Sequence, residues 1–395
     1  MRILLNDYAG YPFILDFAQK LAERGHEVLC VYAGYNTTPQ GNAAVQVGKV
    51  HLQVKPLYTR QPLRKDKFFK RWLQEREYGY LVIDAVKSFH PDVVLSANTP
   101  LDAQWILLGS LNKEGVPFVF WLQDIIGIAT QNILARKMPL VGRWIGKYYI
   151  FLERFLLRKS SRVIAITPDF LPLLERWGVP AERISVIPNW APLDTLPVRP
   201  KKNPWAIRHN LGDKFCFMYT GTLGMKHDPS MLLQLALRYR QDTSVRVVVI
   251  SEGPGANWLR EQKRREKLDN LVLMGYQPFE ELPNVMGAAD VLVALLKPDA
   301  GVFSVPSKVL SYLCAQRPVL AAIPQGNLAA RIIQKEKAGL VVTPKDNRAF
   351  VDAAQRLRNS EEQRLYMGAK GRSYAERYFD IAVIVTRFER IFEAL

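Results

Sequence analysis

Short apolar runs alternate with amphipathic stretches from the start of the chain. The pattern predicts a buried strand at residues 3–5, a loop at Gly10, a helix from about Pro12 that ends at Gly25, and a second strand at residues 27–32. This order is a βαβ unit, whose two strands run parallel. The same alternation predicts further strands at residues 92–95, 117–122, 162–166 and 184–187.

Five prolines between residues 188 and 204 interrupt this alternation. Chain of this composition is stiff and extended, so we expect a linker with a hinge here. Beyond it the pattern resumes, with strands predicted at residues 215–219, 245–250, 271–274, 291–295 and 319–322 and helices at residues 229–239, 257–267, 307–315 and from about 361 onward. We predict two doubly wound parallel-sheet domains facing across a cleft, at residues 1–195 and 196–375, and a terminal helix at residues 376–395 that packs back toward the first domain.

The length and charge of the chain agree with two domains and an anionic partner. Single cores stop growing at about 250 to 300 residues, which is fewer than the 395 residues present. Lys and Arg number 54 against 37 Asp and Glu, which gives a net charge of +17. Such an excess predicts binding to nucleic acid, lipid headgroups or a phosphorylated substrate, and the charge alone does not choose among them.

Cysteine usage and hydropathy favour a cytoplasmic protein. The three cysteines lie far apart in apolar stretches, which argues against a disulfide framework and against a metal site. We expect no signal peptide, because a charge soon interrupts the first apolar run. We also expect no membrane-spanning helix at residues 115–135, because Asp124 would be costly inside a bilayer.

Two loops after predicted strands have the composition of phosphate sites. In the first, Gly221 and Gly224 permit close backbone approach and Lys226 adds a cation, with His227 beside it as a minor candidate. The alternative for this loop is a glycine turn required only by geometry. In the second loop, at residues 305–308, Pro306 and Ser307 predict a capped helix start, and Lys308 adds a further cation. An ordinary capped helix is the alternative there.

Five runs of sequence carry a resemblance to a known family. They are Ile187-Pro-Asn-Trp190, Tyr219-Thr-Gly-Thr-Leu-Gly-Met-Lys226, Ser251-Glu-Gly-Pro254, Ala289-Asp290 and Pro306-Ser-Lys-Val-Leu-Ser-Tyr-Leu-Cys-Ala-Gln-Arg-Pro318. In order and spacing the chain resembles the retaining family 4 glycosyltransferases, especially bacterial members that build capsular, colanic-acid-like or O-antigen polysaccharides. The resemblance covers nearly the whole chain and implies a GT-B fold.

The resemblance also implies the site. The C-terminal domain would hold a nucleotide-diphosphate sugar, and the N-terminal domain would recognise the acceptor. The expected donor-binding residues are Gly10, Gly221, Thr222, Lys226, Gly253, Ser307, Lys308 and Ser311. Gln123 and Asp124 fall near the place of a functional histidine of the family and are the catalytic candidates. Asp124 is a base or orienting group in this interpretation, and a capping residue at a strand end in the alternative one.

Some positions depart from the family pattern. Two glutamates of the family are replaced by Phe303 and Ser311, a glycine by Gln316, and an arginine by Thr222. The loss of these family residues leaves the identity of the sugar donor undetermined and favours an altered or absent activity. The chain has no Asp-x-Asp motif, so we expect no metal and no cofactor, with cations and helix dipoles stabilising the departing diphosphate. The resemblance favours a front-face route with retention.

Basic and aromatic residues are interleaved at residues 60–76 and 136–162. The second segment has the period of a basic amphipathic helix, which suits an anionic membrane surface at the inner face of the plasma membrane, where a lipid-linked acceptor would lie. The alternative is a core-facing helix with a solvated basic face. Nucleic acid fits less well, because no binding motif accompanies the charge.

These features predict a glycosyltransferase of cell-surface polysaccharide synthesis. One alternative is a sugar-nucleotide 2-epimerase, which would need acid and base carboxylates in its cleft and no membrane patch. The other is a non-catalytic, membrane-associated partner of a polysaccharide assembly complex, which the missing glutamates favour.

Overall fold

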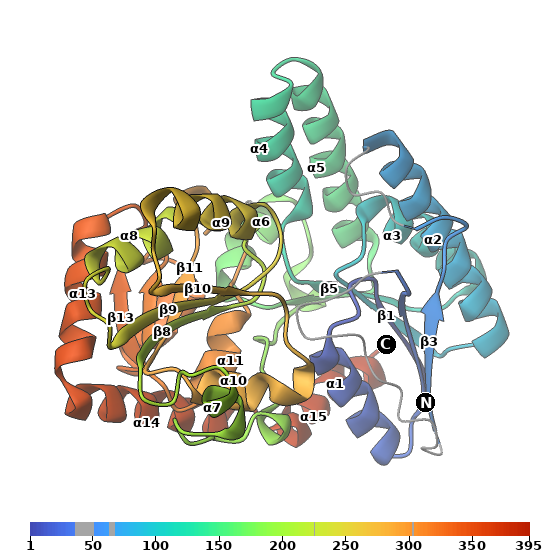
Figure 1. Ribbon diagram of the computed structural model, residues 1–395. Helices are drawn as coiled ribbons and strands as arrows, with labels where there is room; N and C mark the ends of the chain where they lie inside the picture. The colour runs from blue at the N-terminus through green and yellow to red at the C-terminus, as the bar shows by residue number, and fades with distance from the viewer. Residues whose placement is uncertain (36–50, 63–67, 225, 302–303) are drawn as a thin grey trace. The chain divides into compact units, whose positions relative to one another are not determined.

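The computed structural model describes the chain except for residues 36–50, 63–67, 225 and 302–303 (Figure 1). The chain divides into two compact units. Unit 1 contains Met1–Pro188 together with Ile381–Leu395, and unit 2 contains Asn189–Asp380. The last helix therefore belongs to the same unit as the first strand.

Unit 1 is a seven-stranded parallel sheet in the order β3-β2-β1-β4-β5-β6-β7. Its strands are β1 (Arg2–Asp7), β2 (Glu27–Ala33), β3 (Leu52–Leu57), β4 (Val93–Ala97), β5 (Phe118–Leu122), β6 (Arg162–Ala165) and β7 (Ile184–Val186). Its helices are α1 (Pro12–Glu23), α2 (Phe68–Phe89), α3 (Leu101–Glu114), α4 (Ile126–Lys137), α5 (Val141–Lys159), α6 (Leu171–Arg176) and α15 (Ile381–Glu393).

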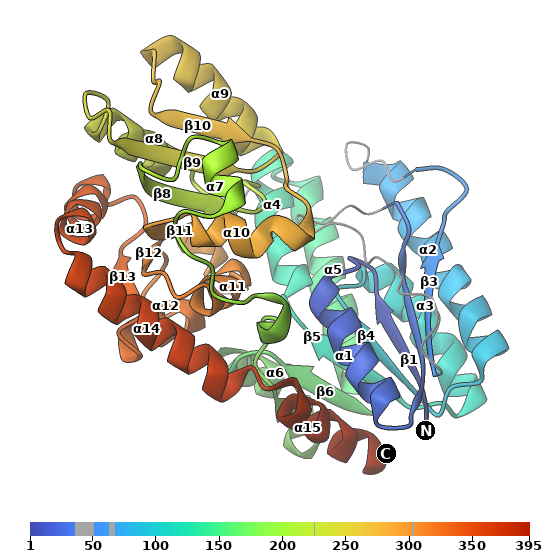
Figure 2. The same cartoon turned by 60° about the horizontal axis from the view of Figure 1, so that its bottom comes forward.

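Helix α15 completes the core of unit 1. The Phe388 ring of α15 lies 4.6 Å from that of Phe17 on α1 and 4.9 Å from that of Trp121 on β5, centroid to centroid. All three side chains are buried. Figure 2 shows α15 beside α1. Large aromatic rings contribute most to such a core, so α15 is an integral part of this unit.

Unit 2 is a six-stranded parallel sheet in the order β10-β9-β8-β11-β12-β13. Its strands are β8 (Phe215–Thr220), β9 (Val245–Ile250), β10 (Leu271–Met274), β11 (Val291–Leu295), β12 (Val319–Ala322) and β13 (Gly339–Val342). Its helices are α7 (Pro204–Arg208), α8 (Ser230–Arg238), α9 (Pro254–Glu266), α10 (Leu282–Gly287), α11 (Lys308–Cys314), α12 (Leu328–Lys335), α13 (Asn347–Asn359) and α14 (Glu361–Tyr378).

The predicted pair of doubly wound parallel-sheet domains is confirmed. The structure adds two edge strands that the sequence pattern did not predict, β3 and β13. β3 is only half buried and contains Pro56, so it lacks the continuous apolar run of a central strand. β13 is apolar, but it has only four residues and begins with a glycine.

The predicted single helix over residues 136–162 is wrong at its start. Helix α4 ends at Lys137 and α5 begins at Val141. Pro139 lies between them, and proline ends a helix because it lacks the amide hydrogen and clashes with the preceding turn. The turn is tight, since a Cβ at Gly142 would lie 2.1 Å from the Leu134 oxygen.

Strand order fixes where a ligand can bind in each unit. Connections run in opposite directions from β1 and β4 in unit 1 and from β8 and β11 in unit 2. In doubly wound sheets, ligands bind at the carboxyl ends of the strands beside such a switch point. The β8–β11 ladder has only two paired positions, Val291 with Phe217 and Leu292 with Met218.

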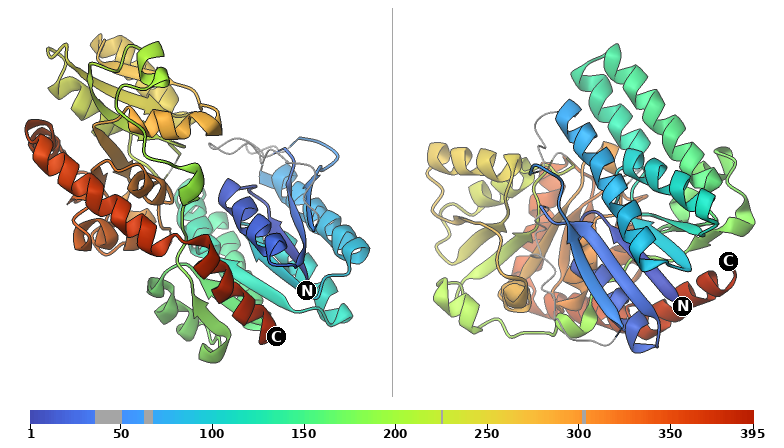
Figure 3. Two further views of the ribbon diagram at one scale, coloured as in Figure 1. Left: turned by 90° about the horizontal axis from the view of Figure 1, so that it is seen from below. Right: turned by 90° about the vertical axis from the view of Figure 1, so that its right-hand side faces the viewer.

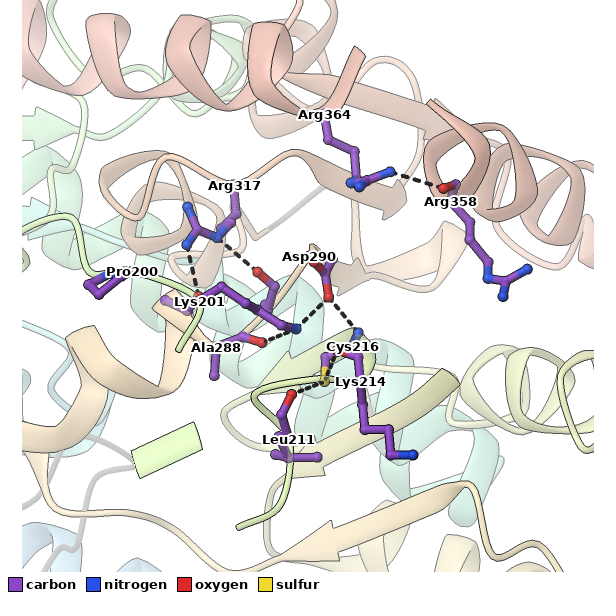
Figure 4. Close-up of polar contacts among 12 residues, drawn as sticks. Pro200, Lys201, Leu211, Lys214, Cys216, Ala288, Asp290, Arg317, Arg358 and Arg364 are labelled. Atoms are coloured by element: carbon purple, nitrogen blue, oxygen red, sulfur yellow. Dashed lines mark hydrogen bonds and ion pairs between the residues drawn. The ribbon is translucent and has the colours of Figure 1, made fainter. Parts of the chain in front are cut away.

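A polar clasp holds the other end of these two strands (Figure 4). Asp290, just before β11, accepts hydrogen bonds from the Cys216 amide at 2.7 Å and from Lys201 Nζ at 2.5 Å. Arg317 donates to the carbonyl oxygens of Ala289 and Gly287 at 2.8 and 2.9 Å. Two of the sequence motifs, Ala289-Asp290 and Arg317-Pro318, therefore hold the sheet together at a distance from its ligand edge.

Candidate functional site

The loops after β8 and β11 are joined at the switch point of unit 2. The Lys297 amide donates to the Lys226 carbonyl oxygen at 2.9 Å. The Lys226 ammonium group donates to Ser304 Oγ at 3.0 Å. Lys226 is thus fixed to the β11 loop through both its backbone and its side chain, as a residue that positions charge should be.

Lys308 begins α11 and lies against Tyr219 of β8. Its ammonium nitrogen is 3.6 Å from the centre of the Tyr219 ring and donates to the tyrosine hydroxyl, which in turn donates to the Thr222 carbonyl oxygen at 2.8 Å. Burial holds the pKa of Lys308 well below its usual range. Among the described residues, no carboxylate lies within ion-pair distance of this ammonium group. An unpaired buried cation is costly, and a bound anion would relieve that cost.

Gly221 lies beside Lys308 in a backbone conformation that favours glycine. Its φ of +101° lies in a region that favours glycine, and a Cβ there would lie 3.7 Å from Lys308 Nζ. The remainder of the turn is tied to the loop after β9, because the Leu223 amide donates to Ser251 Oγ at 2.9 Å. Thr222 reaches the same region, with its hydroxyl 2.9 Å from that of Tyr276.

His227 is held neutral within this cluster. Burial, followed by the charges of Lys308, Lys226 and Lys297, lowers its pKa to about 2. Its Nδ1 atom is buried and has no hydrogen-bond partner among the described residues. A neutral imidazole surrounded by ammonium groups can donate to a phosphate oxygen without adding to their mutual repulsion.

The other residues predicted to bind the sugar donor in unit 2 lie around these loops, and one position that departs from the family pattern lies outside the described residues. Gly253, with a φ of +99°, precedes α9 at the carboxyl end of β9. Ser311 is buried on α11, and Phe303 lies outside the described residues.

The prediction that Ser307 caps this helix is wrong. Its side chain makes no capping hydrogen bond, and its backbone already has helical dihedral angles of −57° and −27°. A capping side chain reaches back to the helix amides only from an extended backbone. Ser307 is exposed at the start of α11.

Two tyrosines belong to the site although composition did not single them out. The Thr220 amide at the end of β8 donates to the Tyr312 hydroxyl at 2.9 Å. The Tyr219 ring lies against the ammonium group of Lys308. Both tyrosines lie inside the motif runs, so the signal was present, but a tyrosine in an apolar strand or helix is first interpreted as core.

Gly10 and Asp7 form the corresponding loop of unit 1. Buried Asp7 accepts hydrogen bonds from the Tyr11 amide at 2.6 Å and from Asn98 Nδ2 at 2.9 Å, so it links the ends of β1 and β4. Burial raises the pKa of Asp7 to about 6 although these bonds oppose the rise. Gly10 has a φ of +72°, and a Cβ there would lie 3.1 Å from the Tyr32 ring. This position therefore requires glycine.

Gln123 and Asp124 follow β5 at the same sheet edge as Gly10. Gln123 is buried and Asp124 is partly buried. The first amides of α4 are capped by Glu153 of α5, which accepts hydrogen bonds from the Ile126 and Gly127 amides at 2.8 and 2.9 Å. Burial raises the pKa of Glu153 to about 8, and the Asp124 charge adds to the rise.

Glu153 predicts a pH dependence of unit 1. Between its ordinary pKa of 4.5 and its folded value of about 8, the folded state holds a proton that the unfolded state has lost, so stability falls as pH rises. We expect the opening free energy of the α4 amides to fall by about 2 kcal/mol from pH 6 to pH 8. Amide hydrogen exchange measures this opening free energy, once the observed rates are corrected for the intrinsic exchange rate at each pH. Glu153→Gln should abolish the slope and exposed Glu175→Gln should keep it. An unchanged slope in Glu153→Gln would contradict this assignment.

Two family descriptions match the chain in succession. Residues 12–190 match a glycosyl transferase 4-like domain, and residues 214–360 match glycosyl transferases group 1. The probable glycosyltransferase WbjE of Pseudomonas aeruginosa is 22% identical over 65% of this chain and 63% of its own length. The 2-deoxystreptamine N-acetyl-D-glucosaminyltransferase of Streptomyces fradiae is 27% identical over 71% of this chain and 67% of its own. The chain thus matches less than two thirds of WbjE.

Solved structures show the fold over the full length. HepE of Anabaena, in complex with UDP-glucose, has a TM-score of 0.75 at 16% identity and covers 100% of both chains. Sucrose-phosphate synthase of Thermosynechococcus elongatus has a TM-score of 0.73 at 16% identity, covering 100% of this chain and 98% of its own. With two successive glycosyltransferase domains and this fold, the chain belongs to the GT-B glycosyltransferase superfamily.

Proposed function

We propose that this protein transfers a sugar from a nucleoside-diphosphate donor to a glycan acceptor with retention, in the synthesis of a cell-surface polysaccharide. One observation carries the proposal: the lysine-lined switch point of unit 2, where partly buried Lys308 has no carboxylate partner among the described residues. A departing nucleoside diphosphate is the anion that a glycosyltransferase must stabilise, and preorganised cations stabilise it.

In the proposed reaction, the acceptor hydroxyl oxygen bonds to the anomeric carbon while the bond to the diphosphate oxygen breaks. The acceptor proton passes to the leaving diphosphate on the same face. Lys226 and Lys308 neutralise the charge that develops there, and the glycine turn at Gly221 lets the backbone approach. The proposal needs no metal, because the lysines supply the positive charge.

The named relatives support a sugar nucleotide and a glycan product. HepE is described with UDP-glucose, and a relative in Escherichia coli K12, 23% identical over 41% of this chain and 40% of its own length, is named for colanic acid biosynthesis. These names describe the relatives. They favour UDP- and GDP-linked sugars as the first donors to test.

The proposal is tested by incubating the purified protein with UDP- and GDP-sugars, with and without a lipid-linked glycan. We expect one donor to raise the melting temperature and to release nucleoside diphosphate when acceptor is present. A donor at about 100 times its dissociation constant adds roughly 2.7 kcal/mol of stability. Interconversion of the nucleotide sugar without acceptor would indicate a 2-epimerase instead. No stabilisation by any donor would indicate a non-catalytic partner.

We propose further that the protein works as a peripheral protein at the cytoplasmic face of an anionic membrane. No helix within residues 1–35, 51–62, 68–224, 226–301 and 304–395 is long and apolar enough to span one. Instead, the α4–α5 hairpin stands out from the sheet of unit 1 (Figures 1 and 3). Its exposed face alternates apolar and basic residues: Leu140, Arg143, Trp144, Lys147, Tyr148, Phe151, Arg154, Phe155 and Arg158. We call this set the hairpin face.

The hairpin face continues onto α2 and α3. Buried Asp102 of α3 accepts hydrogen bonds from Trp72 Nε1 at 3.1 Å and from the Tyr148 hydroxyl at 3.3 Å. It thereby holds α2, α3 and α5 on one side of the sheet. Arg76 stacks 5.0 Å from the Trp72 ring and 5.9 Å from that of Trp105. Of the basic segment at residues 60–76, residues 63–67 lie outside the described residues.

Trp144 and Phe151 are the most exposed aromatic side chains of the hairpin face, with exposed fractions of 74% and 66%. We expect Trp144→Asp with Phe151→Asp to lower binding to vesicles containing phosphatidylglycerol about 1000-fold in a sedimentation assay, since each aromatic side chain loses about 2 kcal/mol of burial. The control Val383→Asp alters a 58% exposed apolar residue elsewhere in unit 1 and should bind as the wild type does. Wild-type binding by the double variant would contradict the membrane proposal.

A further inference from the structure

Lys297 lies two residues after the end of β11, beside the lysines already described. Neither composition nor motif matching selected it. Its amide is bound to the Lys226 carbonyl oxygen at 2.9 Å, so the two residues are neighbours although 71 positions separate them in the chain. Its side chain is partly buried and, among the described residues, has no carboxylate within ion-pair distance.

Two other lysines of the site lie near Lys297. The backbone bond to Lys226 brings Lys297 to the same loops, and the charges of Lys308, Lys226 and Lys297 all lower the pKa of the nearby His227. Thr222, in the glycine turn, carries no charge, and its hydroxyl is engaged with that of Tyr276. Repulsion among three cations on two loops is unfavourable until an anion binds between them.

We infer that Lys297 is a binding residue of this site and that the three lysines together select a diphosphate over a single phosphate group. The inference rests on the proposed function, whose donor carries that group. A diphosphate has two adjacent charged phosphates and can contact ammonium groups from both loops, whereas one phosphate group can satisfy only part of the set. Lys297 thus contributes more to diphosphate than to orthophosphate binding.

Calorimetric titration of the full chain with inorganic pyrophosphate and with orthophosphate tests the inference without requiring the sugar or base. We expect Lys297→Ala to weaken pyrophosphate binding about tenfold or more and orthophosphate binding only about threefold. Lys297→Arg should remain within about threefold of the wild type for pyrophosphate, because it keeps the charge. The exposed control Lys335→Ala should bind both anions as the wild type does.

The melting temperature without ligand separates a binding role from a structural one. Removing one of three repelling cations should leave it equal to or above that of the wild type, whereas loss of a structural lysine would lower it. A Lys297→Ala variant that binds pyrophosphate as tightly as the wild type overturns this inference alone. A folded wild type that binds neither pyrophosphate nor any nucleoside diphosphate overturns both this inference and the proposed function.

Discussion

Lys308→Ala is expected to lower kcat/KM for sugar transfer about 100-fold while the protein stays folded. The variant removes an ammonium group that is already desolvated against Tyr219 and so is preorganised for an anion. Removing one such preorganised group from a transition-state site costs about 100- to 1000-fold in other enzymes. Steady-state rates of nucleoside diphosphate release, with the donor identified by the thermal screen, measure the effect.

A stability measurement and a control variant are needed to interpret the result for Lys308→Ala. Without ligand, Lys308→Ala should melt no lower than the wild type, because the lost cation has no carboxylate partner among the described residues. Lys335→Ala, on the exposed end of α12, should keep wild-type kinetics. A Lys308→Ala variant with wild-type kcat/KM would remove Lys308 from the site.

Asp290→Ala is expected to destabilise unit 2 by about 3 kcal/mol. The variant leaves the Cys216 amide without its acceptor and Lys201 without its carboxylate, and unpaired groups of both kinds cost more than the bonds themselves contribute. Hydrogen exchange of peptides from β8 and β11 reports the loss where it occurs. Asp290→Asn keeps an acceptor for the amide and should lose about half as much.

The matched control for Asp290 is Asp213→Ala. Asp213 is also paired with a lysine, Lys202, at 2.5 Å, but both side chains are largely exposed. Exposed pairs contribute little, so we expect no measurable change in exchange. Equal protection of β8 in Asp290→Ala and the wild type would show that the clasp does not stabilise the sheet.

The fold could be predicted because buried parallel strands appear in the sequence as apolar runs. β9 and β11 were predicted with the bounds that the structure shows, since both are nearly all buried. β3 was missed because polar residues and Pro56 interrupt its apolar positions, and β13 because it has only four residues and begins with a glycine. The turn between α4 and α5 was missed because helical periodicity continues across Pro139.

The site could be predicted only as far as it is local in sequence. Lys226 and Lys308 each stand in a recognisable loop. Lys297 belongs with them only because β8 and β11 are neighbours in the sheet, which strand order decides and periodicity does not. The run Ala289-Asp290 carried part of the family resemblance, and in the structure Asp290 serves the clasp. A motif marks residues under constraint without saying whether the constraint is chemical or structural.

The place of α15 in unit 1 has a consequence for how the protein is made. A ribosome releases residues 1–188 long before it reaches Ile381, so the nascent unit 1 waits with Phe17 and Trp121 uncovered while all of unit 2 is synthesised. Unit 2, which is continuous in sequence, can fold during that interval. A premature stop codon near residue 380 would therefore spare the later half of the gene product and damage the half that was translated first.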